Sequence, residues 1–115
     1  MAGSELEEAA MEQAYQSEQF VWHGVTVEVR YCPDWSPSYR EIYGYPLAHL
    51  EIESIDPPKA ALPMTETGYR SHFCGAPLID EEGGPLAFVR TWLDQAADTP
   101  EWKAQEAAAR QFSLF

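Results

Sequence analysis

The chain has 115 residues, and its 19 aspartates and glutamates face only seven lysines and arginines, which gives a formal net charge of −12 at pH 7. Proteins that bind DNA or RNA directly present lysine and arginine to the phosphates, so this balance argues against direct nucleic-acid binding. A hydrophobic content of 45% with 13% aromatic residues favours one folded domain over residues 1–115 rather than a disordered acidic tail.

The N-terminal region predicts an acidic helix that packs loosely on the rest of the domain. Ser4 followed by Glu7 forms a capping box, and glutamates in the first turn complement the helix dipole. We expect the helix to run from about Glu5 to Gln16, within a flanking region of residues 1–19. Its apolar face is weak because it consists largely of alanine.

The same N-terminal residues lack the apolar core of an export signal, since residues 1–17 are strongly acidic. We therefore expect a cytosolic protein in which Cys32 and Cys74 are free thiols. No stretch approaches the roughly 20 consecutive apolar residues of a membrane span. An anionic chain also has little attraction to an anionic membrane surface, so no membrane partner is expected.

Residues 20–31 predict a β-hairpin. Apolar residues alternate with polar ones after the turn, at Val25, Val27, Val29 and Tyr31. The turn is His23-Gly24, in which glycine supplies the positive φ that a two-residue turn requires.

Residues 32–46 predict an ordered loop rich in aromatic residues, because three prolines and one glycine interrupt any regular period. A third strand is expected from about Ala48 to Ile55, ended by Asp56-Pro57-Pro58. Its inward residues are Ala48, Leu50 and Ile52, and its outward residues are His49, Glu51 and Glu53. The segment from Thr65 to Phe73 is a candidate fourth short strand.

The C-terminal third predicts an acidic loop followed by two helices. The loop is Asp80-Glu81-Glu82-Gly83-Gly84-Pro85, an amphipathic helix follows from Leu86 to Ala97, and a second helix runs from Asp98 to about Gln111. We thus expect an α+β fold with an antiparallel sheet of three or four strands in residues 20–97. The N-terminal helix and the two C-terminal helices, the last within residues 98–115, pack on this sheet. The predicted core consists of Val25, Val27, Val29, Leu50, Ile52, Val89, Trp92 and Leu93.

The cysteines and histidines do not have the spacing of a metal site. None of them forms a Cys-x-x-Cys or His-x-x-x-His pair. No glycine-rich phosphate loop is present, since the one Gly-Gly pair follows two glutamates. We therefore predict no metal, no cofactor and no enzymatic activity. The competing interpretation, a small thiol or metal enzyme, requires one pocket that joins Cys32, His49, His72 and Cys74.

The acidic residues have two interpretations. One is a solvated surface that keeps the protein soluble, although −12 exceeds the magnitude of roughly 2–8 that suffices for a small domain. The other is imitation of nucleic acid, because Glu51 and Glu53 lie ~6.6 Å apart along one strand face, like successive phosphates. Further carboxylates predicted to extend this array are Asp56, Glu66, Asp80, Glu81 and Glu82.

The segment from Pro63 to Phe73 is dense in hydrogen-bonding and aromatic side chains. In a structural role, Arg70 pairs with a carboxylate while Tyr69 and Phe73 anchor in the core. In a functional role, Tyr69 and Arg70 contact a partner or a ligand. The sequence leaves both roles open.

The same segment carries a resemblance. The motifs are Pro63-x-Thr65-x-Thr67-Gly68-Tyr69-Arg70-Ser71-His72-Phe73, Gly83-Gly84-Pro85 and Phe88-Val89-x-x-Trp92-Leu93-Asp94. Over roughly residues 20–94 they resemble a group of small acidic proteins from proteobacterial plasmids, prophages and other mobile elements. Most members of that group have no assigned activity.

In size, charge and mobile-element character the chain is also similar to anti-CRISPR proteins that bind a type I Cascade complex and exclude target DNA. Anti-CRISPR proteins share no common motif, so this likeness is one of character. It implies an inhibitor in the bacterial cytoplasm whose carboxylates occupy a basic protein or ribonucleoprotein surface. The aromatic anchors would be Tyr39, Tyr43 and Tyr45. The alternative is a regulatory or protein-interaction module of a mobile element that does not imitate nucleic acid.

Overall fold

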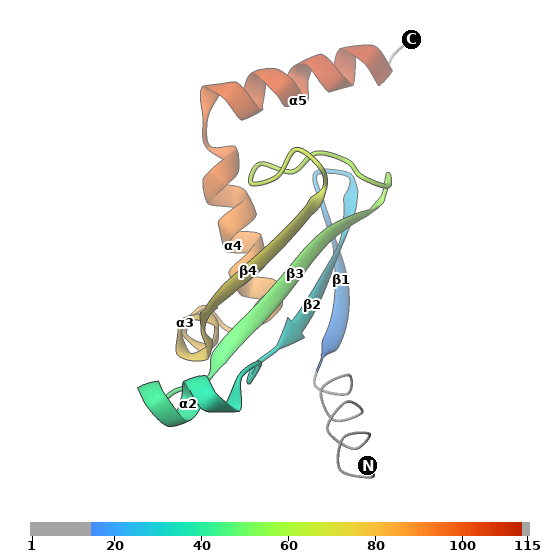
Figure 1. The fold of residues 1–115 in the computed structure, drawn as a ribbon. Helices are drawn as coiled ribbons and strands as arrows, with labels where there is room; N and C mark the ends of the chain where they lie inside the picture. Colours follow the sequence, from blue (N-terminus) through green and yellow to red (C-terminus); the bar gives the residue numbers. More distant parts are fainter. Residues whose placement is uncertain (1–14, 114–115) are drawn as a thin grey trace.

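The computed structural model describes residues 15–113, with side chains to residue 109. Four antiparallel strands form one sheet in the order β1-β2-β3-β4 (Figure 1). The strands are β1 (Gln16–Trp22), β2 (Val25–Cys32), β3 (Leu47–Asp56) and β4 (Tyr69–Gly75). The α+β fold and the fourth strand are thereby confirmed. The predicted N-terminal helix lies almost wholly outside the described residues, and its expected last residue, Gln16, begins β1 instead.

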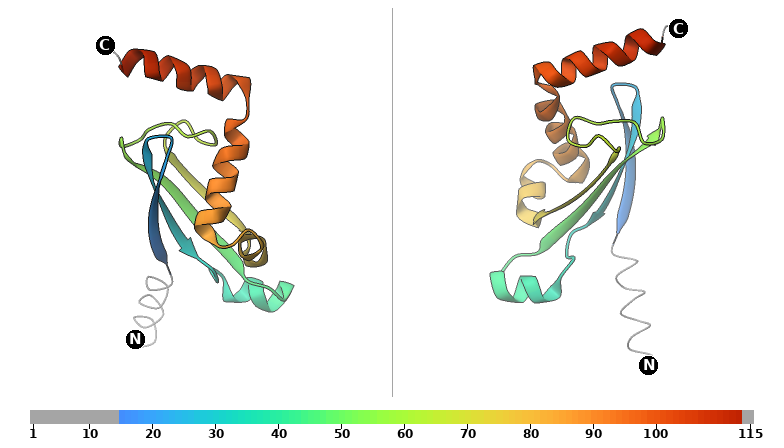
Figure 2. Two further views of the ribbon diagram at one scale, coloured as in Figure 1. Left: turned by 180° about the vertical axis from the view of Figure 1, so that it is seen from behind. Right: turned by 45° about the horizontal axis from the view of Figure 1, so that its top comes forward.

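Four helices accompany the sheet, namely α2 (Pro37–Tyr43), α3 (Ala76–Glu81), α4 (Pro85–Ala97) and α5 (Pro100–Ser113). Helix α4 covers one face of the sheet, and α3 lies at the end of that sheet beside α4 (Figure 2). Helix α5 turns away from α4 and crosses the opposite end of the sheet. None of the described helices is long and apolar enough to cross a membrane.

The predicted hairpin is confirmed. Strands β1 and β2 pair in register with Trp22 opposite Val25, so His23 and Gly24 form a two-residue turn. Both turn residues have positive φ, 48° at His23 and 81° at Gly24. Positive φ at both positions matches the right-handed twist of the strands, which explains why a glycine stands in this turn.

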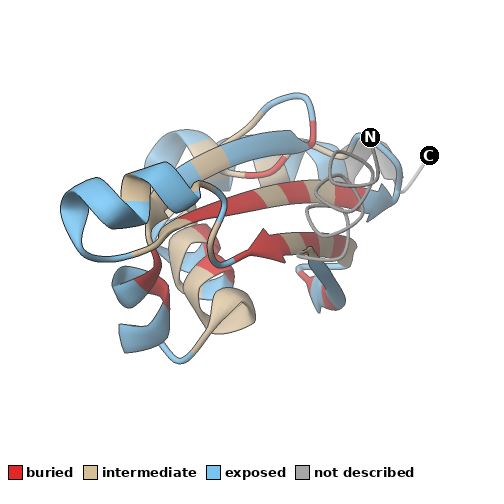
Figure 3. Cartoon of the chain, turned by 60° about the horizontal axis from the view of Figure 1, so that its bottom comes forward, coloured by how far each residue is buried: buried red, intermediate tan, exposed pale blue. Residues whose placement is uncertain are grey.

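The hydrophobic core lies between the sheet and α4. Six predicted core residues are buried, namely Val27, Val29, Leu50, Ile52, Val89 and Leu93. Val25 and Trp92 were also predicted there but are only partly buried at its edge. Hydrophobic residues buried without having been predicted as core are Phe20, Trp22, Tyr31, Cys32, Ala48, Leu62, Ala76 and Ile79. The buried positions follow the middle strands β2 and β3, whereas α2 has no buried residue (Figure 3).

The expected loop of residues 32–46 instead contains helix α2. Ser36 caps the helix by accepting a hydrogen bond from the Tyr39 N–H at 3.2 Å, and Pro37 occupies its first turn. Gly44 ends it in the left-handed conformation with φ 81°. The proline and the glycine that suggested an irregular loop therefore mark the two ends of a short helix.

The acidic segment after β4 is also helical. Asp80 and Glu81 belong to α3, and Glu82 is the residue that ends it. The prediction of a loop there was wrong because α3 has only six residues, too few to establish a helical period. Its buried residues, Ala76 and Ile79, fix the helix against the core.

The segment between β3 and β4 folds back onto the end of β3. The Ser54 hydroxyl donates to the Ala60 carbonyl at 2.7 Å, and the Ser54 N–H donates to the Gly68 carbonyl at 2.8 Å. Gly68 has φ 78°, and a Cβ there would lie 2.8 Å from the Ala60 carbonyl oxygen. Only glycine therefore fits this crossing without displacing the backbone of residues 59–60.

Two isoleucines of β3 provide a direct test of the sheet's burial pattern. Ile52 is fully buried, whereas Ile55 is 36% exposed. We expect Ile52→Ala to lower the free energy of unfolding by about 2–5 kcal/mol, because it removes core contacts and leaves a cavity. Ile55→Ala, the matched control, should cost under about 1 kcal/mol. Urea unfolding measures both, and equal losses would contradict the observed register.

Candidate functional site

The sheet has one face that no described helix covers, and we call it the open face. Alternation along the strands places polar and aromatic side chains on it, while Val27, Val29, Leu50 and Ile52 point toward α4. Cross-strand register sets Glu28 beside Glu53, Arg30 beside Glu51, and His49 beside Phe73. The open face thus has a charged centre and an aromatic end.

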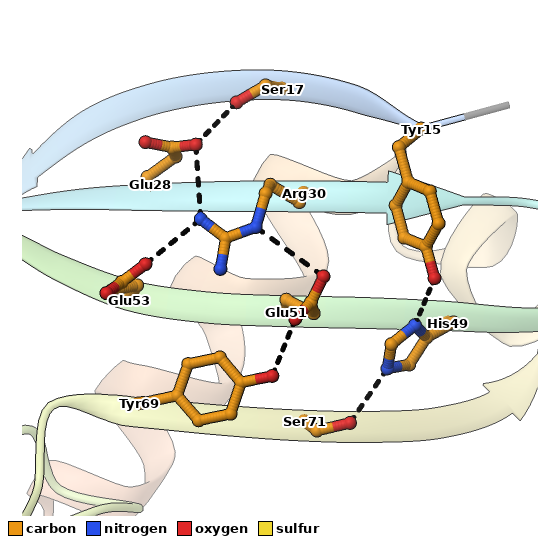
Figure 4. Close-up of polar contacts among 9 residues, drawn as sticks. All are labelled: Tyr15, Ser17, Glu28, Arg30, His49, Glu51, Glu53, Tyr69 and Ser71. Atoms are coloured by element: carbon orange, nitrogen blue, oxygen red, sulfur yellow. Dashed lines mark hydrogen bonds and ion pairs between the residues drawn. The ribbon is translucent and has the colours of Figure 1, made fainter. Parts of the chain in front are cut away.

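Arg30 organises the charged centre (Figure 4). Its guanidinium lies 3.1 Å from Glu53, 3.2 Å from Glu28 and 3.5 Å from Glu51. These three carboxylates share a single cation, so the cluster retains a net charge of two negative units. Glu51 and Glu53 do lie on one strand face as predicted, but neither is a free carboxylate.

Hydroxyl groups bind the same carboxylates. Ser17 donates to Glu28 at 2.8 Å, and the Tyr69 hydroxyl donates to Glu51 at 2.6 Å. The Ser17 bond, together with Arg30, lowers the pKa of Glu28, and the Tyr69 bond, together with Arg30, lowers the pKa of Glu51. The Glu51 carboxylate in turn raises the pKa of Tyr69. The centre is therefore a connected network held in its ionised form at neutral pH.

His49 links this centre to the aromatic end. The Tyr15 hydroxyl lies 2.5 Å from His49 Nδ1, and Ser71 Oγ lies 2.7 Å from His49 Nε2. Phe73 stacks on the imidazole with ring centroids 4.2 Å apart, and Trp35 meets Phe73 edge-on at 4.8 Å. Burial lowers the pKa of His49, which favours its neutral form.

Sequence reasoning did not identify Tyr15 as a site residue, and it considered His49 only within the thiol or metal enzyme interpretation. The outward position of His49 in β3 was the one available signal, and it did not reveal that Phe73 and Tyr15 enclose the ring. The order Ser71, His49, Tyr15 resembles a nucleophile, a base and an orienting group. However, the Glu51 carboxylate neighbours Ser71 across the strands, and it opposes the negative charge that develops during acyl transfer.

The four residues required by the thiol or metal enzyme interpretation do not meet. Cys32 and His49 are cross-strand neighbours, whereas His72 and Cys74 lie opposite Leu50 and Ala48, which point into the core. Burial raises the pKa of both thiols, which makes them less reactive. Among the described residues, no three His, Cys, Asp or Glu side chains are placed so that they could hold a metal ion.

Three predicted tyrosines gather at the end of the sheet that carries α2. The Tyr39 ring lies 4.4 Å from Tyr43 and 5.7 Å from Tyr45, and the hydroxyls of Tyr39 and Tyr45 are 3.2 Å apart. Tyr45 covers Gly75, where a Cβ would lie 2.9 Å from the tyrosine ring. Gly75 follows Phe73 on the same side of β4, so Tyr45 lies next to Phe73 along the strand. The three tyrosines therefore extend the aromatic end of the open face. We call Trp35, Tyr39, Tyr43, Tyr45 and Phe73 the aromatic tip.

The aromatic tip is exposed. Tyr43 is 59% exposed, and Trp35, Tyr45 and Phe73 are 40–45% exposed. Two structural expectations for the segment from Pro63 to Phe73 were therefore wrong, because Tyr69 and Phe73 of β4 lie on the open face rather than in the core. Arg70 points to the other face, where it lies 5.6 Å from the Trp92 ring and donates to the Met64 carbonyl at 3.4 Å. The predicted pairing of Arg70 with a carboxylate is replaced by this cation–π contact.

The predicted carboxylates form three separate groups rather than one array. Glu51 and Glu53 lie in the charged centre, while Asp56 and Glu66 lie at the end of β3 and in the following segment. Asp80, Glu81 and Glu82 are exposed on α3, at the same end of the molecule as the aromatic tip (Figure 1). The Ala76 N–H donates to the Pro46 carbonyl at 2.9 Å and ties these two parts together. Asp80, Glu81 and Glu82 thus form an acidic border at the end of the molecule that carries the aromatic tip, and Glu82 lies toward α4, where it lines a hollow with His72 and Trp92.

Comparison with protein families gives one match. The family model described as KlcB third domain matches residues 15–102, which is most of the chain. The match includes all four strands, the aromatic tip and the start of α5. The chain therefore belongs to the KlcB third-domain family. Searches of the curated proteins and of the solved structures found no significant match.

The Arg30 cluster predicts a defined response to acid. In Arg30→Met the pKa of Glu28 and of Glu51 should rise toward ordinary values, because the guanidinium no longer stabilises either carboxylate. A carboxyl group whose pKa is lower in the folded state stabilises the fold above its unfolded pKa, and this stabilisation is lost as the pH falls. Arg30→Met should therefore lose less stability than the wild type when the pH is lowered. Carbon-13 NMR titration of the carboxyl groups measures these pKa values.

Arg40→Met is the matched control, because Arg40 pairs with Asp34 at 3.5 Å beside α2. It removes the same charge but should leave both glutamate pKa values unchanged. An equal shift in the two variants would show that net charge, rather than the local contacts, lowers these pKa values.

His49 predicts a second pH dependence. Because burial lowers its folded pKa, the neutral ring stabilises the fold above the unfolded pKa of about 6.5, and this contribution is lost as the pH falls. We expect His49→Gln to lose less stability than the wild type between about pH 8 and about pH 5. Urea unfolding at these two values measures the difference. His23→Gln, which changes the histidine of the hairpin turn, is the control. Its stability should fall between these two pH values as much as the wild type's does because of His49.

Proposed function

We propose that this member of the KlcB third-domain family is a non-enzymatic, acidic interaction module that binds a basic surface of a protein or ribonucleoprotein. The observation that carries the proposal is the exposed aromatic tip, which lies at the same end of the molecule as the exposed carboxylates of residues 80–82 (Figure 1). Grouped, exposed aromatic residues with a polar border are typical of protein-binding surfaces. The partner would therefore combine an apolar pocket with lysines and arginines around it.

The two parts of this surface have different physical roles. Tyrosine and tryptophan supply most of the lasting affinity in many interfaces, because they bury large areas with little loss of side-chain entropy. Peripheral carboxylates mainly accelerate encounter with a basic partner, and salt screens this effect. A net charge of −12 provides the long-range attraction, and the aromatic tip provides the anchor.

The specific target that we propose is a type I Cascade complex in the bacterial cytoplasm, with exclusion of target DNA as the result. KlcB is a plasmid-borne protein, which supports a mobile-element context. Imitation of nucleic acid would rest on Asp80, Glu81 and Glu82 more than on Glu51 and Glu53, because Arg30 compensates the latter pair. Occlusion by the aromatic tip does not require such imitation.

A gel-shift experiment with purified type I Cascade and target DNA tests this proposal. We expect the wild-type chain to block DNA binding, and Tyr43→Ser to raise the concentration needed at least about tenfold. Reversal of Asp80, Glu81 and Glu82 to lysine should slow association and flatten its dependence on salt, because fewer ion pairs form. Val21→Ser, which changes a 67% exposed residue of β1, is the control and should act as the wild type.

The outcomes separate the general proposal from the specific target. Full inhibition by both altered proteins would contradict the role of the aromatic tip and its acidic border. If Cascade is not inhibited, a nuclease-treated lysate pull-down identifies another partner, and the same variants are compared on it. Retention of that partner by Tyr43→Ser at wild-type strength would overturn the module proposal itself.

A further inference from the structure

A second surface lies at the opposite end of the molecule from the aromatic tip. Helix α5 crosses above the hairpin turn and above the segment that follows β3 (Figures 1 and 2). Between them is a groove of about 740 Å³, within the size range of binding sites. Apolar residues form most of its walls, among them Trp22, Val25, Pro57, Ala61 and Trp102.

The sequence of α5 produces this groove. Trp102, Gln105, Glu106 and Ala109 line it, and their spacing of three, four and seven residues from Trp102 places them on one face of the helix. Trp102 lies 6.0 Å from Trp22, and Glu106 lies 2.7 Å from His23 at the hairpin turn. Alanines on both walls leave the space between these contacts open.

The two tryptophans differ in their hydrogen bonding. The Trp22 indole N–H donates to Asp94 at 2.9 Å. The Trp102 indole N–H is buried, and no acceptor for it exists among the described residues. An unsatisfied buried donor lowers stability, so an occupant that brings a hydrogen-bond acceptor to this N–H would be favoured.

The charges around the groove select a cationic occupant. Glu106 lies in the groove, Asp56 directly precedes Pro57 at its wall, and Glu101 lies on the first turn of α5. Lys59 is an opposing cation in the segment after β3, Lys103 already pairs with Asp98 at 3.1 Å, and His23 contacts Glu106. Among the side chains that the structure describes around the groove, carboxylates outnumber lysines and arginines, as they do over the whole sequence.

We propose that this groove binds a cationic amphipathic segment of a protein partner. An apolar side chain of the segment packs against Trp22 and Trp102, a carbonyl group accepts the hydrogen bond from Trp102, and a lysine or arginine reaches Glu106. Nucleic acid is the wrong occupant, because its phosphates would face the carboxylates. This site shares no residue with the aromatic tip and does not depend on the function proposed above.

The test uses a 14-residue peptide of leucine and lysine in a helical amphipathic pattern, added to the full chain at physiological salt. Nitrogen-15 NMR resolves the indole N–H signals of the four tryptophans. We expect the signals of Trp22 and Trp102 to shift in a saturable manner while that of Trp35 stays in place. A peptide with glutamate in place of lysine should produce no shift.

Ala109→Arg provides the decisive variant, because it places a bulky cation in the groove on an exposed helix position. It should weaken peptide binding at least about tenfold, a loss of about 1.4 kcal/mol. Ala107→Arg adds the same charge to the outer face of α5 and should bind as the wild type, as should Tyr43→Ser. Equal weakening by the two arginine variants, shifts confined to Trp35, or no shift at all would overturn the proposal.

Discussion

Because α4 packs against one face of the sheet, the side chains on the other face must be ones that water can contact or that bond to one another. Val89 and Leu93 of α4 are fully buried with Val27 and Leu50 of the middle strands. Strand side chains alternate, so the residues between these buried ones face away from the helix. A face without a covering layer must satisfy its own polar groups, and the hydrogen bonds of Arg30 and His49 meet that requirement without a second helix.

The excess of acidic residues makes the placement of the few cations important. A net charge of −12 destabilises a compact chain through self-repulsion. Arg30 counters this repulsion at the point where three glutamates of two adjacent strands meet. In contrast, the side chains of Asp80, Glu81 and Glu82 are exposed at the end of α3, where water screens them and no cation is needed for stability.

The parts of the fold that were predictable from sequence are those with a local signal. The hairpin follows from His23-Gly24, and α4 follows from its apolar stripe, because both patterns involve near neighbours in the chain. The cation shared by Glu51 and Glu53 was not predictable, since it depends on the register that sets β2 beside β3. The exposure of Phe73 depends on which sheet face the helices cover, and that is a property of the whole fold.

The distribution of uncompensated charge favours contacts at the two ends of the sheet rather than at its centre. Arg30 reduces the negative potential of the open face. The carboxylates at the end of α3 and at Asp56 have no such cation beside them among the described residues, so the potential there stays negative. Each of these acidic regions lies at the same end of the molecule as accessible aromatic residues, namely the aromatic tip at one end and the two tryptophans of the groove at the other (Figure 1). Under the two binding proposals, charge would draw a basic partner to places where apolar contact can hold it, and the centre of the sheet would keep those places in position.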